Sequence, residues 1–533
     1  MATNIPETKL TRLQTVARCS PALILLLLGF SLLSFIQTTD HSISGYPTWD
    51  YRWVIGITEL AVYVWVRAFS HVPLRAQLST LALVCGLQLS LYSVLYTDGF
   101  MGDGRPILAW RWTLSTDQIW DNQKINNSAH ATLPIDLLTT TKFDSPSFRG
   151  SDRTGRMSAV PLARQWIHPP EKLWVHPVGL GWSSFAVVGN YCITQEQRGD
   201  DECVVCYELR TGKEVWSHSD LAYFNEVTSG MGPRATPSIQ DGRVFALGAT
   251  GILNCLDGSN GQRIWSINIL KDNDAENALF GMSGSPLLLN GLVIVSPGGE
   301  AGSLVAYDQL TGDRVWASGN VNTSYSSPQY ADFATGPQVL NFNAEGIYGH
   351  DVNSGKVLWN YPWISNPSER NNVCQPVALP SDEETPDQVF ISSGYGRGCA
   401  LFDLIKVGKT WEVRKRWSNR NLKAKFSSVV RSGDHVYGLD GSILVCIDLA
   451  TGDRCWKGGR YGYGQLSLVD DMLIVQAESG EIVLVEAIPE RHHELARFAA
   501  LSQRTWNHPV VSGSLLLVRN DREAACYQLP VTK

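Results

Sequence analysis

The chain has 533 residues and a formal net charge of -7 at neutral pH. It is too long for one ordinary domain, and its acidic balance excludes the basic surface that nucleic-acid binding requires. Glycine and tryptophan are abundant, with 47 and 18 residues, which favours many tight turns and buried aromatic anchors over a helical enzyme.

The first 97 residues differ from the rest of the chain because they contain three long apolar stretches. Pro21–Ile36 and Leu78–Tyr96 carry no charge, so each is long enough, or nearly so, to cross a bilayer. Trp53–Val66 is apolar but contains Glu59, so it is either a third spanning helix or an interfacial or packed amphipathic helix. We expect residues 1–97 to be a membrane region with about three transmembrane helices.

Basic residues near these stretches predict their orientation. Lys9, Arg12 and Arg18 precede Pro21–Ile36, and Arg67 and Arg75 follow Trp53–Val66. The positive-inside rule then places the N-terminus in the cytoplasm, and three crossings place the rest of the chain on the periplasmic side of the cytoplasmic membrane. If the first stretch were instead a cleaved signal peptide, the two later stretches would still anchor the chain, although the sidedness would need a new argument.

Residues 98–160 lose the apolar periodicity and are rich in Asp, Asn, Ser, Thr and Pro. This composition predicts a linker or stalk next to the membrane. Within it, Trp110 and Trp112 are expected either at the membrane interface or docked onto the following domain.

A ten-residue phrase, "YDQLTGDRVW" at Tyr307–Trp316, recurs along the rest of the chain. An apolar alternating run precedes each copy, and Gly312 lies at a turn position that requires a left-handed backbone conformation. The phrase therefore predicts a β-hairpin. Four other copies have nearly the same form: "YELRTGKEVW" ending at Trp216, "LDGSNGQRIW" at Trp265, "HDVNSGKVLW" at Trp359 and "IDLATGDRCW" at Trp456.

The spacing of the copies predicts the architecture. Repeats of about 40 to 50 residues are typical of β-propeller blades, since one four-stranded blade cannot bury both faces alone. A degenerate copy with an insertion ends at Trp417, and residues 161–533 then hold about eight periods. A tryptophan strand at Trp174 has no partner before it, and the last strand near Tyr527 has no tryptophan strand after it. Joined, they complete the eighth blade and close the ring.

The pattern Asp-x-x-Thr/Ser-Gly-x-x-x-Trp resembles the tryptophan-docking repeat of quinoprotein-type eight-bladed propellers, which include PQQ-dependent dehydrogenases and BamB-type assembly proteins. The stretches "SFRGSDRTG", "GPRATPSI", "RYGYGQLSL" and "VRNDREAACYQLP" resemble membrane-anchored PQQ-like repeat proteins of planctomycete bacteria. This resemblance implies an all-β eight-bladed propeller and allows PQQ with calcium as a cofactor. It does not decide the function, because docking tryptophans belong to the scaffold in members with and without a cofactor. The predicted docking residues are Trp174, Trp216, Trp265, Trp316, Trp359, Trp417 and Trp456.

Four cysteines occupy the same place in their repeats, two residues before the Asp-equivalent position: Cys206, Cys255, Cys446 and Cys526. Other repeats have Ala or Gly there, so we expect a small buried filler in each blade. Cys203 and Cys206 lie three apart on one strand and face opposite sides, which argues against a zinc site. A cross-strand disulfide between Cys192 and Cys206 is an alternative if the intervening turn centres near Gly199.

Polar residues of the inter-blade loops are the candidate site residues, because a propeller gathers such loops around one mouth of its channel. Arg234, Lys425 and Arg460 are predicted to bind an anionic ligand such as a carboxylate or the tricarboxylate of PQQ. The alternative is that each is a solvated loop residue paired with a neighbouring acid. Further loop candidates are Tyr325, Asn372, Gln375, Tyr461 and Asn507, whereas Glu478 is expected to be a turn residue.

Two functions follow from the sequence. One is a binding or scaffold propeller outside the cytoplasmic membrane, with a protein partner or a small anionic ligand at its mouth. The other is a PQQ-dependent oxidoreductase that passes electrons to the membrane. The chain has no vicinal Cys-Cys and no Cys-x-x-Cys-His motif, and neither a metal site nor a catalytic residue is assigned. Whether the protein is an enzyme is left open.

Overall fold

The computed structural model describes residues 93–113, 135–365, 370–382 and 385–532, together with positions 57, 58, 61 and 90. The chain divides into two compact units, Met1–Thr113 and Leu114–Lys533. In the first unit, β1 (Leu95–Phe100) and β2 (Pro106–Trp110) form an antiparallel hairpin. The rings of Trp110 and Trp112 stack with their centroids 5.0 Å apart.

The predicted membrane region falls almost entirely outside the described residues. Pro21–Ile36 has no described position, and Trp53–Val66 has only three. Within Leu78–Tyr96, the described residues Ser90, Ser93 and Val94 are helical, whereas Leu95 and Tyr96 belong to strand β1, so the predicted stretch extends two residues beyond the helix. None of the residues that the structure describes lies in a helix long and apolar enough to span a bilayer.

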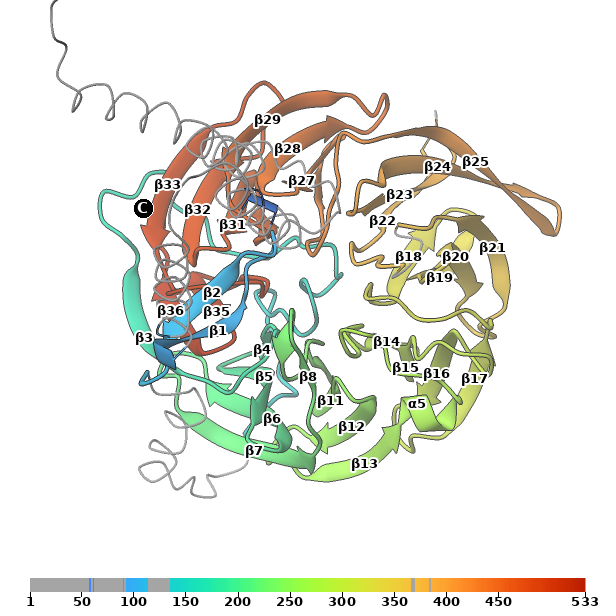
Figure 1. The fold of residues 1–533 in the computed structure, drawn as a ribbon. Coiled ribbons are helices and arrows are strands. Elements are labelled where there is room, and N and C mark those ends of the chain that lie inside the picture. Colours follow the sequence, from blue (N-terminus) through green and yellow to red (C-terminus); the bar gives the residue numbers. More distant parts are fainter. Residues whose placement is uncertain are drawn as a thin grey trace, which may run out of the picture. The chain divides into compact units, whose positions relative to one another are not determined.

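The second unit is an eight-bladed β-propeller, which confirms the predicted fold (Figure 1). Each blade is a four-stranded antiparallel sheet whose first strand lies innermost. Blades 1 to 4 consist of β4 (Ala186–Val188), β5 (Tyr191–Arg198), β6 (Asp201–Glu208) and β7 (Glu214–Leu221); β10 (Ser238–Gln240), β11 (Arg243–Leu247), β12 (Ile252–Asp257) and β13 (Arg263–Asn268); β14 (Leu287–Leu289), β15 (Leu292–Val295), β16 (Leu304–Asp308) and β17 (Arg314–Ser318); and β18 (Gln329–Phe333), β19 (Gly336–Phe342), β20 (Gly346–Asp351) and β21 (Val357–Pro362). Blades 5 to 8 consist of β22 (Val377–Leu379), β23 (Asp387–Ser393), β24 (Gly398–Val407) and β25 (Thr410–Asn419); β26 (Val430–Ser432), β27 (His435–Asp440), β28 (Ile443–Asp448) and β29 (Arg454–Arg460); β30 (Gln465–Val469), β31 (Met472–Gln476), β32 (Glu481–Glu486) and β33 (Glu494–Ala499); and β34 (Val510–Ser512), β35 (Leu515–Arg519), β36 (Glu523–Gln528) and β3 (Glu171–Pro177).

Blade 8 closes the ring with both ends of the propeller sequence. Its outermost strand β3 pairs antiparallel with β36, and Trp174 lies opposite Cys526. The two terminal strands therefore complete the eighth blade and close the ring, as the sequence predicted, and no separate capping element is needed there.

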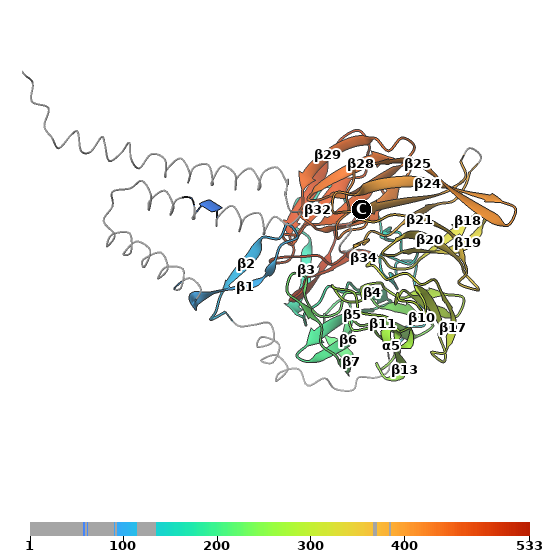
Figure 2. The same cartoon turned by 45° about the vertical axis from the view of Figure 1, so that its right-hand side comes forward.

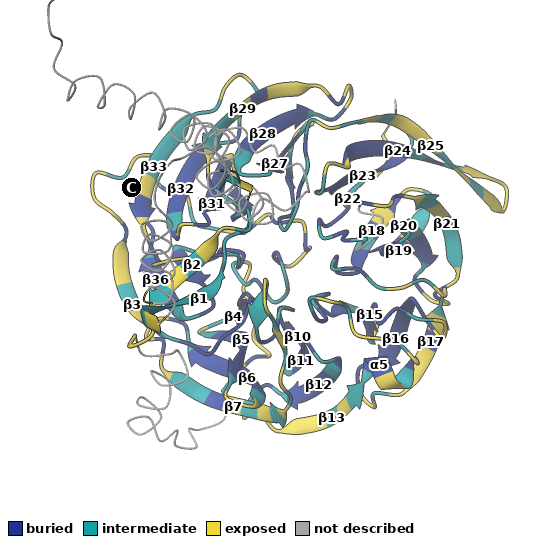
Figure 3. Ribbon diagram, in the orientation of Figure 1, coloured by how far each residue is buried: buried dark blue, intermediate teal, exposed yellow. Residues whose placement is uncertain are grey.

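Burial falls from the centre of the ring to its rim (Figure 3). All five residues of β30 are buried, whereas β7 has only one buried residue, Trp216, and then alternates between exposed and half-buried positions. β30 is buried along its whole length, including its polar residues Gln465 and Ser467, because neighbouring blades pack on both of its faces, while outer strands show one face to solvent. The longest outer hairpin, β24–β25, extends beyond the rim of the ring (Figures 1 and 2).

Two short elements decorate the connections between blades. The hairpin of β8 (Asn225–Glu226) and β9 (Gly230–Met231) lies between blades 1 and 2. The one-turn helix α5 (Ile269–Asp272) follows blade 2, and the side chain of Asn268 caps its N-terminus.

The repeated phrase joins neighbouring blades. In blade 3, Trp316 lies opposite the small residue Ala306, and Trp216 lies opposite Cys206 in blade 1. The Trp216 indole donates a hydrogen bond of 3.0 Å to the carbonyl of Gly258 in the turn of blade 2. The small residues predicted as fillers, including the four repeat cysteines, are buried and leave room for these indoles.

Residues 145–160, where the sequence predicted a linker, lie against the innermost strands of the propeller. Ser145 bridges to Val187 of blade 1, Arg156 to Leu468 of blade 7 and Ala159 to Gly513 of blade 8. We call residues 145–160 the central segment. Its chain occupies the middle of the ring, which is visible among the innermost strands in Figure 1.

Candidate functional site

One face of the propeller carries all the connections between blades. Each blade has four antiparallel strands, so its first strand begins and its last strand ends on the same face of the propeller. All connections from one blade to the next therefore lie on that face. We call this side the loop face. Each of its eight inter-blade connections supplies an aromatic residue: Trp182, Phe224, Phe280, Tyr325, Trp363, Phe426, Tyr463 and Trp506.

Four of these aromatic rings form a continuous group, which we call the loop-face cluster. The centroids of Trp182 and Trp506 are 4.7 Å apart. The ring of Phe426 lies 5.4 Å from that of Trp506 and 5.5 Å from that of Tyr463. Connections that are distant in sequence therefore meet at blades 6, 7, 8 and 1, which only a closed ring permits.

Two cations lie over the loop-face cluster. The guanidinium of Arg504 is 4.7 Å from the Trp182 ring and 4.5 Å from the Trp506 ring. The ammonium of Lys425 is 4.8 Å from Phe426 and 4.9 Å from Tyr463. Such stacking uses the negative face of each ring and keeps the cations oriented.

Two acids hold this arrangement in place. Arg504 forms an ion pair of 2.9 Å with Asp521. Glu478 accepts hydrogen bonds from the Trp506 indole at 2.8 Å and from the backbone amide of Tyr463 at 3.1 Å. Glu478 therefore lies in the turn after β31, as expected, and it also fixes two rings of the cluster.

Arg234 lies on the loop face, between β9 and β10. Its guanidinium stacks over Phe224 at 4.4 Å and donates hydrogen bonds to Ser229 and to the carbonyls of Gly230 and Gly232. Burial lowers the pKa of Arg234 to about 10, against the opposing effect of nearby carboxylates, so the side chain is a cation at neutral pH. Most of its donors are already used within its own loop.

The other two predicted cations have different surroundings. Lys425 contacts the loop-face cluster and also lies 5.4 Å from the Tyr395 ring. Arg460 is exposed at the end of β29, where its backbone pairs with Ile443. Binding of one ligand by all three stays a prediction. Arg504 was not among the predicted residues, although it is the cation most closely joined to the rings.

Several other loop candidates connect neighbouring blades. Asn372 is buried and donates to the carbonyls of Asn343 and Trp363, at 2.8 and 3.1 Å. Gln375 accepts hydrogen bonds from Ser326 and Ser327. The remaining candidates make comparable contacts: Asn507 donates to Ser183, Tyr461 to Glu494, and Tyr325 accepts from the amide of Phe280.

Glu202 is a buried carboxylate near Arg234. It accepts a hydrogen bond of 3.0 Å from the amide of Ala249 and one of 3.4 Å from Thr250. Burial raises the pKa of Glu202 to about 7, and these hydrogen bonds and the Arg234 charge only partly oppose the increase. The loop face therefore contains a carboxyl group that titrates near neutral pH.

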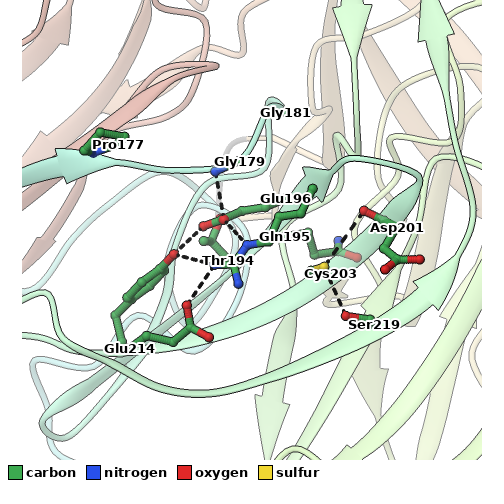
Figure 4. Close-up of polar contacts among 12 residues, drawn as sticks. Pro177, Gly179, Gly181, Thr194, Gln195, Glu196, Asp201, Cys203, Glu214 and Ser219 are labelled. Carbon is green, nitrogen blue, oxygen red and sulfur yellow. Dashed lines mark hydrogen bonds and ion pairs between the residues drawn. The ribbon is translucent and has the colours of Figure 1, made fainter. Parts of the chain in front are cut away.

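A buried charge network joins blades 8 and 1 (Figure 4). Glu196 pairs with Arg198 at 3.0 Å and accepts hydrogen bonds from Tyr207 and from the Gly179 amide, at 2.7 and 2.9 Å. Burial opposes ionisation of Glu196, but the charges of Arg198 and Arg519 and these hydrogen bonds hold its pKa below the ordinary value. This carboxylate is thus paired and structural.

The cysteines in the described part of the chain form no disulfide. The nine cysteines that the structure describes are all free. The predicted alternative of a Cys192–Cys206 disulfide is wrong, because Cys192 lies opposite Tyr207 and Cys206 opposite Ile193. That offset of one residue places the two thiols on opposite faces of the sheet. Across the described part of the chain, no group of three or more His, Cys, Asp or Glu residues is placed to hold a metal ion.

Comparison with known proteins gives two kinds of similarity. The family model for "Outer membrane protein assembly factor BamB" matches residues 200–458. A Burkholderia pseudomallei protein with that description is 26% identical over 303 residues, which cover 54% of this chain and 69% of that protein. The quinohemoprotein alcohol dehydrogenase ADH-IIG of Pseudomonas putida is 27% identical over 125 residues, which cover 22% of this chain and only 17% of the dehydrogenase.

Among solved structures, the quinohemoprotein alcohol dehydrogenase from Comamonas testosteroni superposes with a TM-score of 0.54 at 12% identity. The superposition covers 76% of this chain and 84% of that one. At that identity the likeness shows the propeller fold alone.

Proposed function

We propose that this chain is a binding module that recognises a protein partner through its loop face. The observation that carries the proposal is the loop-face cluster, where rings from four blades meet under the cations Arg504 and Lys425. Arg504 and Trp182 are buried within the cluster, whereas Lys425, Phe426, Tyr463 and Trp506 are partly exposed. Partly exposed aromatic side chains that are held in place by buried neighbours are among the residues that most often dominate the free energy of protein–protein binding.

Exposed apolar side chains on the neighbouring loops support the same function. Leu221, the last residue of blade 1, is 86% exposed, and Tyr223 and Val227 in the connection that follows are also exposed. Leu279, in the next connection, is also exposed. Scattered exposed apolar residues are ordinary, but a group of them beside aromatic rings marks an interaction surface. We expect a partner segment with apolar side chains flanked by carboxylates, which would meet Lys425 and Arg460.

The setting of the module is part of the proposal. The apolar stretches of residues 1–97 support anchoring in the cytoplasmic membrane, and the flanking basic residues support a periplasmic propeller. A similar protein is described as an outer membrane protein assembly factor, which fits a propeller that works by binding other proteins.

Photo-crosslinking in intact cells tests the proposal. A photoreactive amino acid at Tyr463 of the full-length chain should give one discrete crosslinked partner, and the same probe at Leu310, on an outer turn, should not. Replacing Trp506 with Ala in the Tyr463 probe chain should remove the crosslink. Equal crosslinking from both positions, or a crosslink that survives Trp506→Ala, would contradict recognition by the loop face.

A PQQ-dependent oxidoreductase is the second candidate. It is favoured by the sequence match to a quinohemoprotein alcohol dehydrogenase and by cations stacked on aromatic rings. Arg504 and Lys425 would meet the carboxylates of the cofactor, and the rings of Trp506 and Tyr463 would lie against its plane. Bound PQQ would supply a two-electron acceptor. Incubating the full-length chain with PQQ and calcium, then removing free cofactor, should leave a quinone absorbance that Lys425→Gln weakens. A chain that retains no cofactor would exclude this candidate.

A further inference from the structure

Two cysteines of blade 6 lie side by side in the hairpin formed by β28 and β29. In the pairing of these strands, Cys446 lies opposite Trp456. The next residue, Ile447, lies opposite Arg454, so Cys455 is the extra residue of a β-bulge. In such a bulge two consecutive residues, here Cys455 and Trp456, oppose one residue of the partner strand. The backbone therefore places Cys455 next to Cys446.

The side chains of the two cysteines are in contact. The Cys446 thiol donates a hydrogen bond to the Cys455 sulfur, and the Tyr437 hydroxyl donates one to the Cys446 sulfur. Residues that oppose each other in an antiparallel pair have Cα atoms about 4.5 to 5.5 Å apart, and disulfides join Cα atoms roughly 4.4 to 6.8 Å apart. A bond between the two sulfurs therefore needs little rearrangement of the strands.

The other blades have the same bulge but not the same pair of residues. Blades 1, 2 and 8 have a cysteine at the position of Cys446, namely Cys206, Cys255 and Cys526. Their bulge residues are Val215, Ile264 and Leu173, and those of blades 3, 4, 5 and 7 are Val315, Leu358, Arg416 and Leu495. Among the eight blades that the structure describes, blade 6 alone has cysteine at both positions, so the fold does not require the pair.

The two thiols differ in their access to solvent. Of the nine cysteines that the structure describes, Cys455 is the exposed one, whereas Cys446 is buried. Burial raises the pKa of the Cys446 thiol, and the neighbouring Cys455 and Asp448 act in the same direction, so Cys446 is protonated at neutral pH. Because the thiolate is the reactive form, a reagent in solution reacts first with Cys455.

We propose that Cys455 and Cys446 are an oxidisable pair that reacts with disulfide-bearing oxidants and closes to an intrachain disulfide. The Cys455 thiolate attacks one sulfur of the external disulfide, which releases one thiol and leaves a mixed disulfide on Cys455. Cys446 then loses its proton, attacks the Cys455 sulfur and releases the second thiol. Two protein thiols are thus oxidised to one disulfide, and one external disulfide is reduced to two thiols.

The closed pair would act on the contact between blades 6 and 7. Trp456 directly follows Cys455, and its indole donates a hydrogen bond of 2.8 Å to the carbonyl of Ile488, which follows β32 of blade 7. A disulfide at the bulge would fix the backbone that orients this indole. The pair lies on the outer strands of its blade, and its chemistry does not depend on the loop-face cluster or on a protein partner there.

Peptide mapping after oxidation tests the pair. The reduced, folded full-length chain is incubated with oxidised glutathione, the reaction is stopped with acid, the remaining thiols are alkylated, and the chain is digested without reductant. Trypsin cleaves after Arg454, so Cys446 and Cys455 fall in separate peptides, 432–454 and 455–457. Mass spectrometry should find these two peptides joined by a disulfide in most of the oxidised chain.

Two variants serve as matched controls. Cys455→Val places at the bulge the residue type that blades 1 and 3 have there, and it should abolish the joined peptides. Ile264→Cys adds a thiol at the exposed bulge opposite Cys255, and it should produce a second joined pair, peptides 244–263 and 264–271.

The wild-type map decides the question alone if a variant does not fold. A folded wild-type chain in which Cys455 retains glutathione without joining Cys446, or in which Cys455 joins a different cysteine, would show that the proposal is wrong.

Discussion

The indole of Trp316 lies against Gly355, the turn glycine of the next blade, so closely that a Cβ added at Gly355 would come within 2.3 Å of the ring. Trp216 has the same relationship with Gly261, at 2.5 Å. Each copy of the repeated phrase therefore makes a hairpin and also provides the surface on which the preceding tryptophan docks. The repeated sequence therefore specifies a hairpin that docks onto the next blade, and it recurs because neighbouring blades of the ring pack in the same way.

Gly355→Ala is expected to destabilise the propeller by about 2 to 4 kcal/mol, because it combines a clash with the Trp316 ring and a residue with a side chain at φ 69°. Gly433→Ala is the matched control, since Gly433 also has a positive φ, of 57°, but nothing lies within 4 Å of the added atom. Chemical unfolding should show a clearly larger loss for Gly355. Equal losses would mean that the docking contact contributes little.

Trp316→Ala should cost roughly 3 to 5 kcal/mol, as large-to-small changes in a packed core do. Thermal unfolding measures the loss, and Trp112→Ala, which removes an exposed indole, serves as the control. An unchanged unfolding midpoint for Trp316→Ala would count against docking between blades.

Glu202 should make the stability of the propeller depend on pH. Its folded pKa of about 7 lies above the unfolded value of about 4.3, so the folded state binds the proton more tightly. Stability from this group is fully present below about pH 4 and is lost as the pH rises through about 7, a change of about 4 kcal/mol. Glu202→Gln should remove this loss when unfolding is measured at several pH values between 5 and 8. The same pH dependence in wild type and Glu202→Gln would disprove the assignment, and the exposed Glu300→Gln should behave as wild type.

Arg519 joins blade 8 to blade 1 from a fully buried position. Arg519→Met should leave the carbonyls of Gly179 and Gln195 and the charge of Glu196 without their partner, at a cost of about 3 to 5 kcal/mol. Hydrogen exchange would locate the effect, because opening should begin at β3 and β36. Uniform loss of protection in all blades would contradict a local role at the ring closure.

The propeller could be predicted from the sequence because its determinants are local. Gly312, Trp316 and the residues between them specify a hairpin within ten positions, and the recurrence of that pattern gives the blades. The closing pair of β3 and β36 was also predictable, because each strand lacked a neighbour along the chain.

The central segment and the loop-face cluster could not be predicted in the same way. Residues 145–160 have neither helical nor strand periodicity, and their contacts, such as Arg149 with Val429, join positions far apart in sequence. The only sequence signal within the central segment was the stretch "SFRGSDRTG", which resembles PQQ-like repeat proteins but does not indicate where the segment packs. Arg504 could not be predicted because it stacks on Trp182, which is more than 300 positions earlier in the sequence and comes beside it only in the closed ring.

The affinity of the crosslinked partner for the loop face tests the proposed function most directly. Once that partner is identified and purified, its binding to the full-length chain is measured by calorimetry for wild type, for Phe426→Ala with Tyr463→Ala, and for Leu310→Ala. Recognition by the loop-face cluster predicts that the double variant weakens binding by about a hundredfold, as loss of aromatic anchors does, and that Leu310→Ala binds as wild type. Wild-type affinity in a folded double variant would contradict the account.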